Sequence, residues 1–262
     1  MGNELYTKKQ ENLNKILAHQ EGEWVPTLSM FTGGAVAWAG TTFKEVWHDP
    51  ERYVKAMCKV YEDIWVDTFQ LASLINPVDI VDYFPEIQNK LGPDGTTLEH
   101  LQRSPMEAGE YDQLIANPDK FVADVLIPRM FPKFFEDRTW AKEGVKRLAQ
   151  SRAHLFGTLT ESTHKEIEER FGIIPIMRSG IAFANPLDII FDSFRGFRGT
   201  LTDIRRQPEK VKAALDVIWE NQMVPRMKPL DDPYPYIFQP PHIPAYISPK
   251  QFEALYWTCL YD

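Results

Sequence analysis

Four short apolar segments constrain the fold of this chain more than any other feature, because each has the length and composition of a buried β-strand. They are residues 24–30, 66–73, 172–179 and 236–239. Between the first two, Asp49 and Pro50 can begin an amphipathic helix. A strand, a helix and a second strand in succession are typical of a parallel unit. We therefore expect an α/β fold built on a parallel sheet.

The stretch between the second and third strand segments breaks this alternation. Residues 74–170 contain seven prolines, and their apolar spacing predicts helices over residues 111–115, 118–126 and 140–156. A structureless loop of this length is uncommon inside a compact domain. We interpret residues 74–170 as a helical insertion that forms a lid over one end of the sheet. Further helices are expected over residues 5–19, 186–194, 208–224 and after Ser248.

Composition narrows the classes of partner. The chain has 262 residues and a formal net charge of −8. This negative charge argues against nucleic acid or an anionic membrane surface as the main binding partner, because binding phosphate groups requires clustered lysines and arginines. No apolar run approaches the roughly 18 residues of a spanning helix, and the first ten residues have no signal-peptide core. Cys58 and Cys259 lie far apart and are expected to be reduced thiols in a cytoplasmic protein.

Four segments resemble, in order and spacing, the uroporphyrinogen decarboxylase superfamily. They are residues 25–34, residues 67–73, residues 194–211 with the Arg-Gly-Phe-Arg-Gly motif, and residues 242–257 with Ser248 and Pro249. The resemblance implies a TIM-type (β/α) barrel, as a single domain over residues 1–262. Such a barrel has eight strands, so we expect an incomplete barrel of about four, truncated at its C-terminus.

Departures from the family pattern bear on the reaction. The arginines that clamp a porphyrinogen's carboxylates align with Phe31 and Ala35, and the aspartate beneath its pyrrole nitrogens aligns with Leu74. None of the three can take over that role. The resemblance then favours a methyltransferase-like enzyme of one-carbon metabolism, with a small methylated substrate and a corrinoid carried by a partner protein. A zinc-binding His-x-Cys is missing, so zinc would need residues downstream of Asp262.

Two alternatives stay open. One is a uroporphyrinogen or related decarboxylase of porphyrin biosynthesis. The other is a non-catalytic truncated fragment or pseudo-enzyme. An open half-barrel would expose unpaired strand edges, and we expect it to form a homodimer or to bind a complementary C-terminal fragment.

Barrel active sites lie at the carboxyl ends of the strands, and this rule selects the candidate residues. His242 and Arg178 are the expected catalytic pair, a near-neutral acid–base group and an anion holder. Expected substrate contacts are Met30, Phe31, Gly33, Gly34, Ser73, Asn185 and Tyr246.

Most of these candidates also have a structural explanation. His242 could bond backbone carbonyls, Asn185 could cap a helix, and Gly33 and Gly34 could form a tight turn. Ser73 could bond local backbone, and Arg178 could pair with an acidic residue of the insertion. Outside the candidate list, Arg195 and Arg198 are expected to pair with Asp203 or with helix ends.

Overall fold

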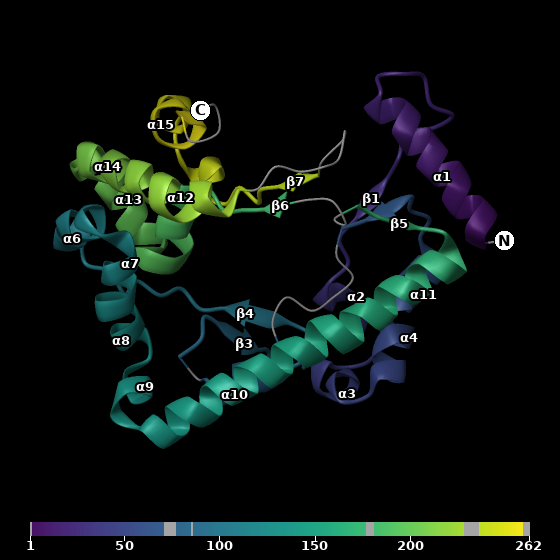
Figure 1. Cartoon of the computed structure of the whole chain (residues 1–262), viewed down its shortest axis with the longest axis horizontal. Helices are drawn as coiled ribbons and strands as arrows, with labels where there is room; N and C mark the ends of the chain where they lie inside the picture. Colours follow the sequence, from purple (N-terminus) through teal and green to yellow (C-terminus); the bar gives the residue numbers. More distant parts are fainter. Residues whose placement is uncertain (1, 71–76, 85, 177–180, 228–235, 259–262) are drawn as a thin grey trace. The chain divides into compact units, whose positions relative to one another are not determined.

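The computed structural model describes residues 2–70, 77–84, 86–176, 181–227 and 236–258. The chain divides into two compact units (Figure 1). Unit 1 comprises Met1–His100 and Lys142–Ser179, and unit 2 comprises Leu101–Ala141 and Gly180–Asp262. The described residues form an α/β structure that is mostly helical.

The centre of unit 1 is a parallel three-stranded sheet. Its strands are β1 (Leu28–Ser29), β2 (Thr68–Phe69) and β5 (Ile174–Pro175), in the order β1-β2-β5. Leu28 pairs with Thr68, and Thr68 pairs with Ile174. The three strand segments expected from the sequence are thus confirmed, as is their parallel arrangement, although each strand is shorter than expected.

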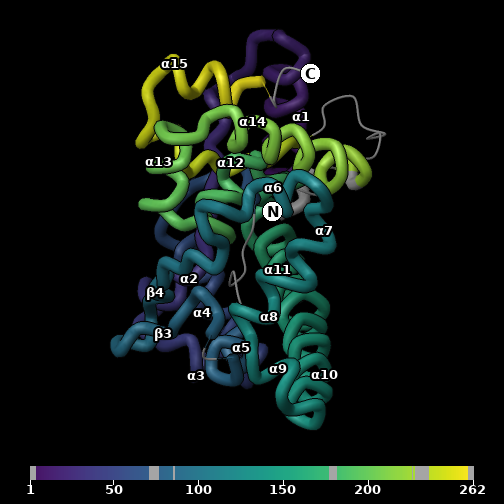
Figure 2. The backbone as a smooth tube through the Cα atoms, turned by 90° about the vertical axis from the view of Figure 1, so that its left-hand side faces the viewer, coloured from purple at the N-terminus to yellow at the C-terminus, as the bar shows by residue number. Residues whose placement is uncertain are grey.

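The helices of unit 1 are α1 (Gly2–Leu17), α2 (Gly33–Trp38), α3 (Phe43–Trp47), α4 (Pro50–Asp63), α5 (Val78–Tyr83), the end of α10 (Arg138–His154), the π-helical turn η3 (Leu155–Thr160) and α11 (Glu161–Phe171). Of these, α1, α4 and α10 were expected from the sequence, and the others were not. Asp49 caps α4 by accepting a hydrogen bond from the backbone N–H of Arg52. Helix α11 packs against α4 and α1, and in Figure 2 it lies above α10, which precedes it in the chain.

Two local expectations in unit 1 are wrong. Gly33 and Gly34 do not form a tight turn, because they open helix α2. Residues 74–170 are not helical throughout, since they include the antiparallel hairpin of β3 (Asn89–Leu91) and β4 (Leu98–His100). Gly95, with φ of +69°, lies in the turn of that hairpin, in a region that L side chains rarely adopt.

Buried polar groups hold the sheet of unit 1 in place. Asp67 is 2% exposed, and its carboxylate accepts hydrogen bonds from Trp24 Nε1 (2.9 Å) and from the backbone N–H (2.8 Å) and hydroxyl (2.9 Å) of Thr27. Lys9 of α1 donates to the carbonyl of Val66 at 2.7 Å, and burial lowers its pKa. Both contacts converge on the residues that lead into β2.

Unit 2 contains a parallel pair of strands, β6 (Ile181–Ala182) and β7 (Ile237–Phe238). Its N-terminal helical part comprises η1 (Ala108–Glu110), α6 (Tyr111–Ala116), α7 (Pro118–Phe121), η2 (Val122–Leu126), α8 (Ile127–Met130), α9 (Pro132–Glu136) and the start of α10. Its C-terminal part comprises α12 (Pro186–Ile189), η5 (Ile190–Phe194), α13 (Gly196–Arg206), α14 (Pro208–Ile218), η6 (Trp219–Met223), η7 (Val224–Arg226), η8 (Ile243–Tyr246), α15 (Pro249–Phe252) and η9 (Glu253–Trp257).

The fourth expected strand is confirmed as β7, but its partner differs from the expectation. β7 pairs with β6, which the sequence did not indicate, and neither strand joins the three-stranded sheet. Among the described residues the strands therefore form separate small sheets, and no closed barrel is found there. Within those same residues, no helix combines the length and apolar character that crossing a membrane requires.

Replacing Asp67 by alanine should destabilise unit 1. The change leaves the indole N–H of Trp24 and the two Thr27 donors without their acceptor, so the free energy of unfolding should fall by about 2–4 kcal/mol. Asp82→Ala, which removes only an exposed ion pair with Lys44, should cost about 0.5 kcal/mol or less. Urea denaturation followed by circular dichroism measures both, and an equal loss in the two variants would contradict this role for Asp67.

Candidate functional site

The parallel pairing of β6 and β7 determines which loops of unit 2 come together. Ile181 pairs with Ile237, and Ala182 pairs with Phe238. Because parallel strands end at the same edge, the segments that follow them, residues 183–192 and 239–246, leave from that edge. Crevices outside the carboxyl ends of parallel strands are where α/β proteins usually bind ligands.

A buried carboxylate joins these two segments. Asp188 of α12 is 1% exposed. One carboxylate oxygen accepts hydrogen bonds from the backbone N–H groups of His242 (3.1 Å) and Ile243 (2.8 Å), and the other accepts one from the hydroxyl of Tyr256 (2.7 Å). These bonds satisfy donors at the start of η8, which would otherwise be unpaired. They therefore set the position of His242.

His242 forms a close pair with a second carboxylate on the same helical segment. Its Nδ1 lies 2.7 Å from Oδ2 of Asp192, and its side chain is 53% exposed. Asp192 follows Asp188 by four residues, about one helical turn. Since an ionised carboxylate only accepts hydrogen bonds, we assign the Nδ1 proton to this contact. Nε2 is the other nitrogen of this half-exposed ring.

Aromatic rings lie on the two elements of this pair, η5 and η8, and on α13. Tyr246 stacks on Phe191 with ring centroids 6.2 Å apart, and it meets Phe197 edge-on at 4.9 Å. Tyr246 is 54% exposed. The three rings form one aromatic cluster in unit 2.

The remaining predicted residues of unit 2 are explained by structure. Asn185 is buried and caps α12, accepting from the backbone N–H of Leu187 (2.9 Å) and donating to the carbonyl of Tyr256 (3.1 Å). Its expected role as a helix cap is confirmed. Arg195 pairs with Asp203 at 2.6 Å, as expected. Arg178 lies outside the described residues.

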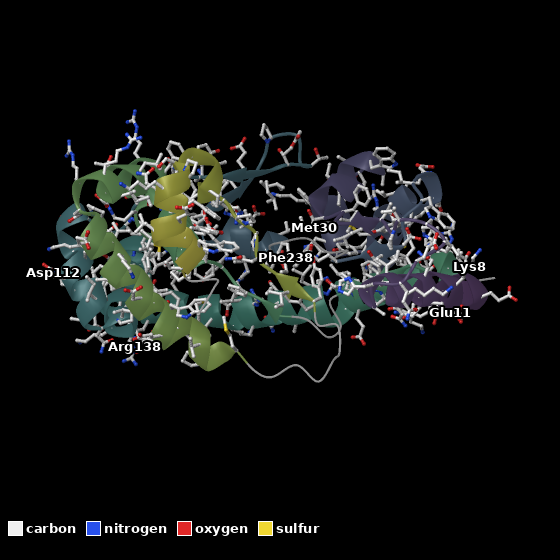
Figure 3. The ribbon with its side chains drawn as sticks, turned by 90° about the horizontal axis from the view of Figure 1, so that it is seen from above. Lys8, Glu11, Met30, Asp112, Arg138 and Phe238 are labelled. Atoms are coloured by element: carbon white, nitrogen blue, oxygen red, sulfur yellow. The ribbon has the colours of Figure 1, made fainter. Side chains whose placement is uncertain are left out.

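The other candidates lie in unit 1. Met30 directly follows β1 and is half exposed (Figure 3). Phe31 packs edge-on against Tyr61 at 5.9 Å. A Cβ atom on Gly33 would lie 2.6 Å from the ring of Phe43, so close packing explains that glycine, whereas Gly34 has open space around it. Ser73 lies outside the described residues.

The sequence reasoning overlooked the two aspartates that organise His242. Asp188 and Asp192 occur four residues apart in a segment directly after a strand. That spacing places both on one helix face, and this was the available signal. Among the described residues no group of three or more His, Cys, Asp or Glu side chains could hold a metal ion. The His242–Asp192 pair alone offers two ligand atoms, fewer than a zinc site needs.

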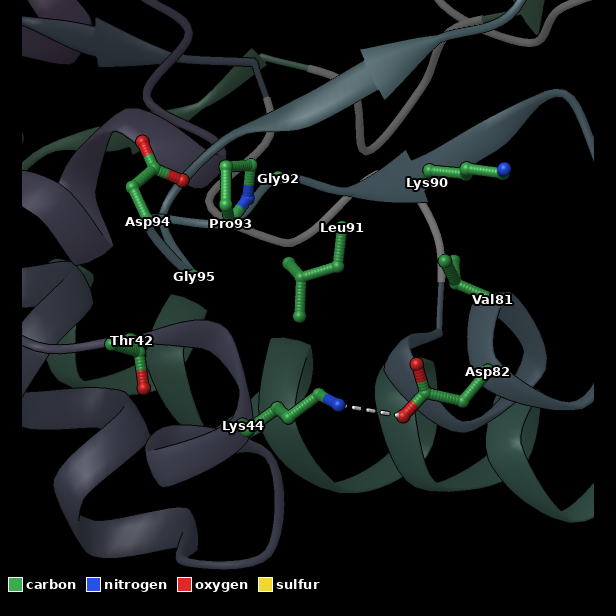
Figure 4. A pocket seen from close by; sticks show the side chains of 10 residues that line it. All are labelled: Thr42, Lys44, Val81, Asp82, Lys90, Leu91, Gly92, Pro93, Asp94 and Gly95. Atoms are coloured by element: carbon green, nitrogen blue, oxygen red, sulfur yellow. Dashed lines mark ion pairs between the residues drawn. The ribbon is translucent and has the colours of Figure 1, made fainter.

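A cavity of about 530 Å³ in unit 1 lies between the β3–β4 hairpin and α3 and α5 (Figure 4). Its charged lining is largely paired within itself. Lys44 and Asp82 form an ion pair at 3.0 Å. Hydrogen bonds from the backbone of Thr96 and the hydroxyl of Thr97 lower the pKa of Asp94 to about 2. The charged groups Lys44, Asp82 and Asp94 thus stabilise the local fold, and they do not indicate a ligand site.

Comparison with known proteins finds no match for this chain among protein-family models, curated proteins or solved structures. Function therefore has to be argued from the residues themselves.

Asp188 and Asp192 should differ sharply when each is replaced by alanine. Asp188→Ala leaves two backbone N–H groups and a buried hydroxyl without an acceptor, and should lower the free energy of unfolding by about 2–4 kcal/mol. Asp192→Ala removes a partly exposed pair and should cost about 1 kcal/mol or less. Thermal and urea unfolding check both. Similar stabilities for the two variants would mean that Asp188 does not anchor η8.

Proposed function

We propose that this protein is a methyltransferase-like enzyme of the uroporphyrinogen decarboxylase superfamily, acting on a small methylated substrate. The observation that carries the proposal is the pairing of half-exposed His242 with Asp192 at the carboxyl end of β7. The family resemblance of residues 25–34, 67–73, 194–211 and 242–257 supplies the reaction class. The corresponding fold is an incomplete (β/α) barrel, supported by the parallel pairing within the β1-β2-β5 sheet and within the β6-β7 pair.

In this proposal His242 acts as a general acid. When the bond between the methyl carbon and its heteroatom breaks, the electron pair stays on the heteroatom, which takes a proton from Nε2 of His242. Asp192 stabilises the imidazolium that precedes this transfer, and water returns the proton afterwards. A corrinoid bound to a partner protein would supply the methyl acceptor. Asp188 contributes by fixing the backbone of His242.

The nature of the substrate follows from the side chains that replace the family's anion clamps. Phe31 packs against Tyr61, and Ala35 is fully buried. Neither carries a charge that could hold a carboxylate. The family resemblance therefore supports a substrate with fewer negative charges than a porphyrinogen.

Methyl transfer should depend on His242. With methyl ethers, methylamines and methyl thioethers as donors and free reduced cobalamin as acceptor, His242→Gln should lower the rate at least about 100-fold, the scale of general acid catalysis. Asp192→Asn should lower it less, because the imidazole remains. His48→Gln is the matched control, since His48 is an exposed histidine near a carboxylate, Asp79. The visible spectrum of cobalamin reports the rate.

Equal rates for the His242→Gln variant and the unaltered protein would remove His242 from the mechanism. A folded protein that methylates cobalamin from none of the donors would instead favour the non-catalytic alternative.

Uroporphyrinogen should not be decarboxylated. Because Phe31 and Ala35 cannot pair with its carboxylate arms, incubation with the protein should yield no coproporphyrinogen above a blank without protein. Chromatography of the oxidised porphyrins measures this directly. Product formation in proportion to protein concentration would support the decarboxylase alternative.

A further inference from the structure

A second feature of unit 2, separate from His242, is a row of polar side chains along α13. Arg198, Thr202 and Arg206 follow one another at intervals of four residues. Residues four apart lie on the same side of a helix. Two guanidinium groups with a hydroxyl between them are therefore presented along one face.

This face forms one side of a cavity of about 630 Å³. Residues 108–109, which precede α6, also line it, together with Arg195 and Asp203. Three arginines and one aspartate give the lining an excess of two positive charges. The whole chain carries a net charge of −8, so this cavity has the opposite sign to the protein as a whole.

The single carboxylate in the cavity is already engaged. Asp203 is 2% exposed and accepts hydrogen bonds from Nε of Arg195 (2.6 Å) and from the hydroxyl of Tyr111 (3.1 Å). Arg195 also donates to the carbonyl of Met106 at 2.5 Å. Asp203 thus neutralises Arg195 and leaves the charges of Arg198 and Arg206 unbalanced.

Arg198 and Arg206 are exposed, and neither forms an ion pair with any residue that the structure describes. The sequence-based expectation that Arg198 pairs with Asp203 or with a helix end is therefore not met within the described chain, whereas the one for Arg195 is. Gly199 leaves room for the side chain of Arg195, because a Cβ atom at position 199 would lie 3.0 Å from Cζ of Arg195. The cavity thus combines one arginine held in its wall, Arg195, with two exposed arginines that have no ion-pair partner among the described residues.

We propose that this cavity binds the diphosphate group of a small molecule. Planar guanidinium groups bind phosphate oxygens through paired hydrogen bonds, which makes arginine the usual residue for phosphate recognition. Arg198 and Arg206 are eight residues apart, which corresponds to about 12 Å along a helix. Because arginine side chains are long, both guanidinium groups can converge on the position of Thr202. Two linked phosphates offer each guanidinium its own oxygens there, which a single phosphate does not. A free diphosphate and a nucleoside diphosphate share this chemistry.

Isothermal titration calorimetry of the full chain tests the proposal with sodium pyrophosphate, ADP, orthophosphate and citrate. Pyrophosphate should bind at one site, about tenfold or more tighter than orthophosphate. Arg198→Gln and Arg206→Gln should each weaken it by about tenfold or more, the scale for losing a charge-assisted hydrogen bond. Arg205→Gln is the matched control, since Arg205 is an exposed arginine of the same helix that does not line the cavity. It should change affinity by less than about twofold.

Comparing the affinity for ADP with that for pyrophosphate distinguishes a nucleoside diphosphate from a free diphosphate as the ligand. Tighter binding of ADP than of pyrophosphate identifies a nucleotide as the ligand, and equal or weaker binding identifies the free diphosphate. Three results would overturn the proposal: no saturable binding of either compound at millimolar concentration, citrate or orthophosphate binding as tightly as pyrophosphate, or an equal loss in the Arg205→Gln control. Thermal melts of each variant establish that the fold is retained.

Discussion

In each unit, a buried carboxylate that satisfies several donors at once holds together segments that are far apart in the sequence. Asp67 joins the entry of β2 to Trp24 and Thr27, some 40 residues earlier. Asp188 joins α12 to the backbone at residues 242–243 and to Tyr256. A buried ion is costly unless its lone pairs are filled. Each carboxylate therefore specifies one arrangement of its donors, and the elements around it follow.

The exposed chemistry of unit 2 depends on that arrangement. His242 begins η8 at the point where Asp188 captures two consecutive backbone N–H groups, so its imidazole meets Asp192, one turn further along the same segment. The two aspartates have different roles because they differ in burial. The fully buried aspartate stabilises the backbone, while the partly exposed one can respond to the charge on the imidazole.

Charge is distributed unevenly over unit 2, and this gives it two chemically different surfaces. Around His242 lie two carboxylates, those of Asp188 and Asp192. Along α13 the engagement of Asp203 by Arg195 and Tyr111 leaves two arginines unbalanced. This surface is positively charged although the protein is acidic, because Asp203 pairs with Arg195 and does not neutralise Arg198 or Arg206.

The sequence by itself determined the local elements. The strand segments at 28–29, 68–69, 174–175 and 237–238, the capping of α4 by Asp49 and that of α15 by Ser248 all follow from short-range periodicity and from hydrogen bonds between residues a few positions apart. The candidate His242 also came from its position after a strand. Tertiary structure alone decided that β7 pairs with β6 and that Asp188 and Asp192 organise His242. These outcomes depend on hydrogen bonds and strand pairings that mostly span more than 50 residues, whose partners local patterns cannot indicate.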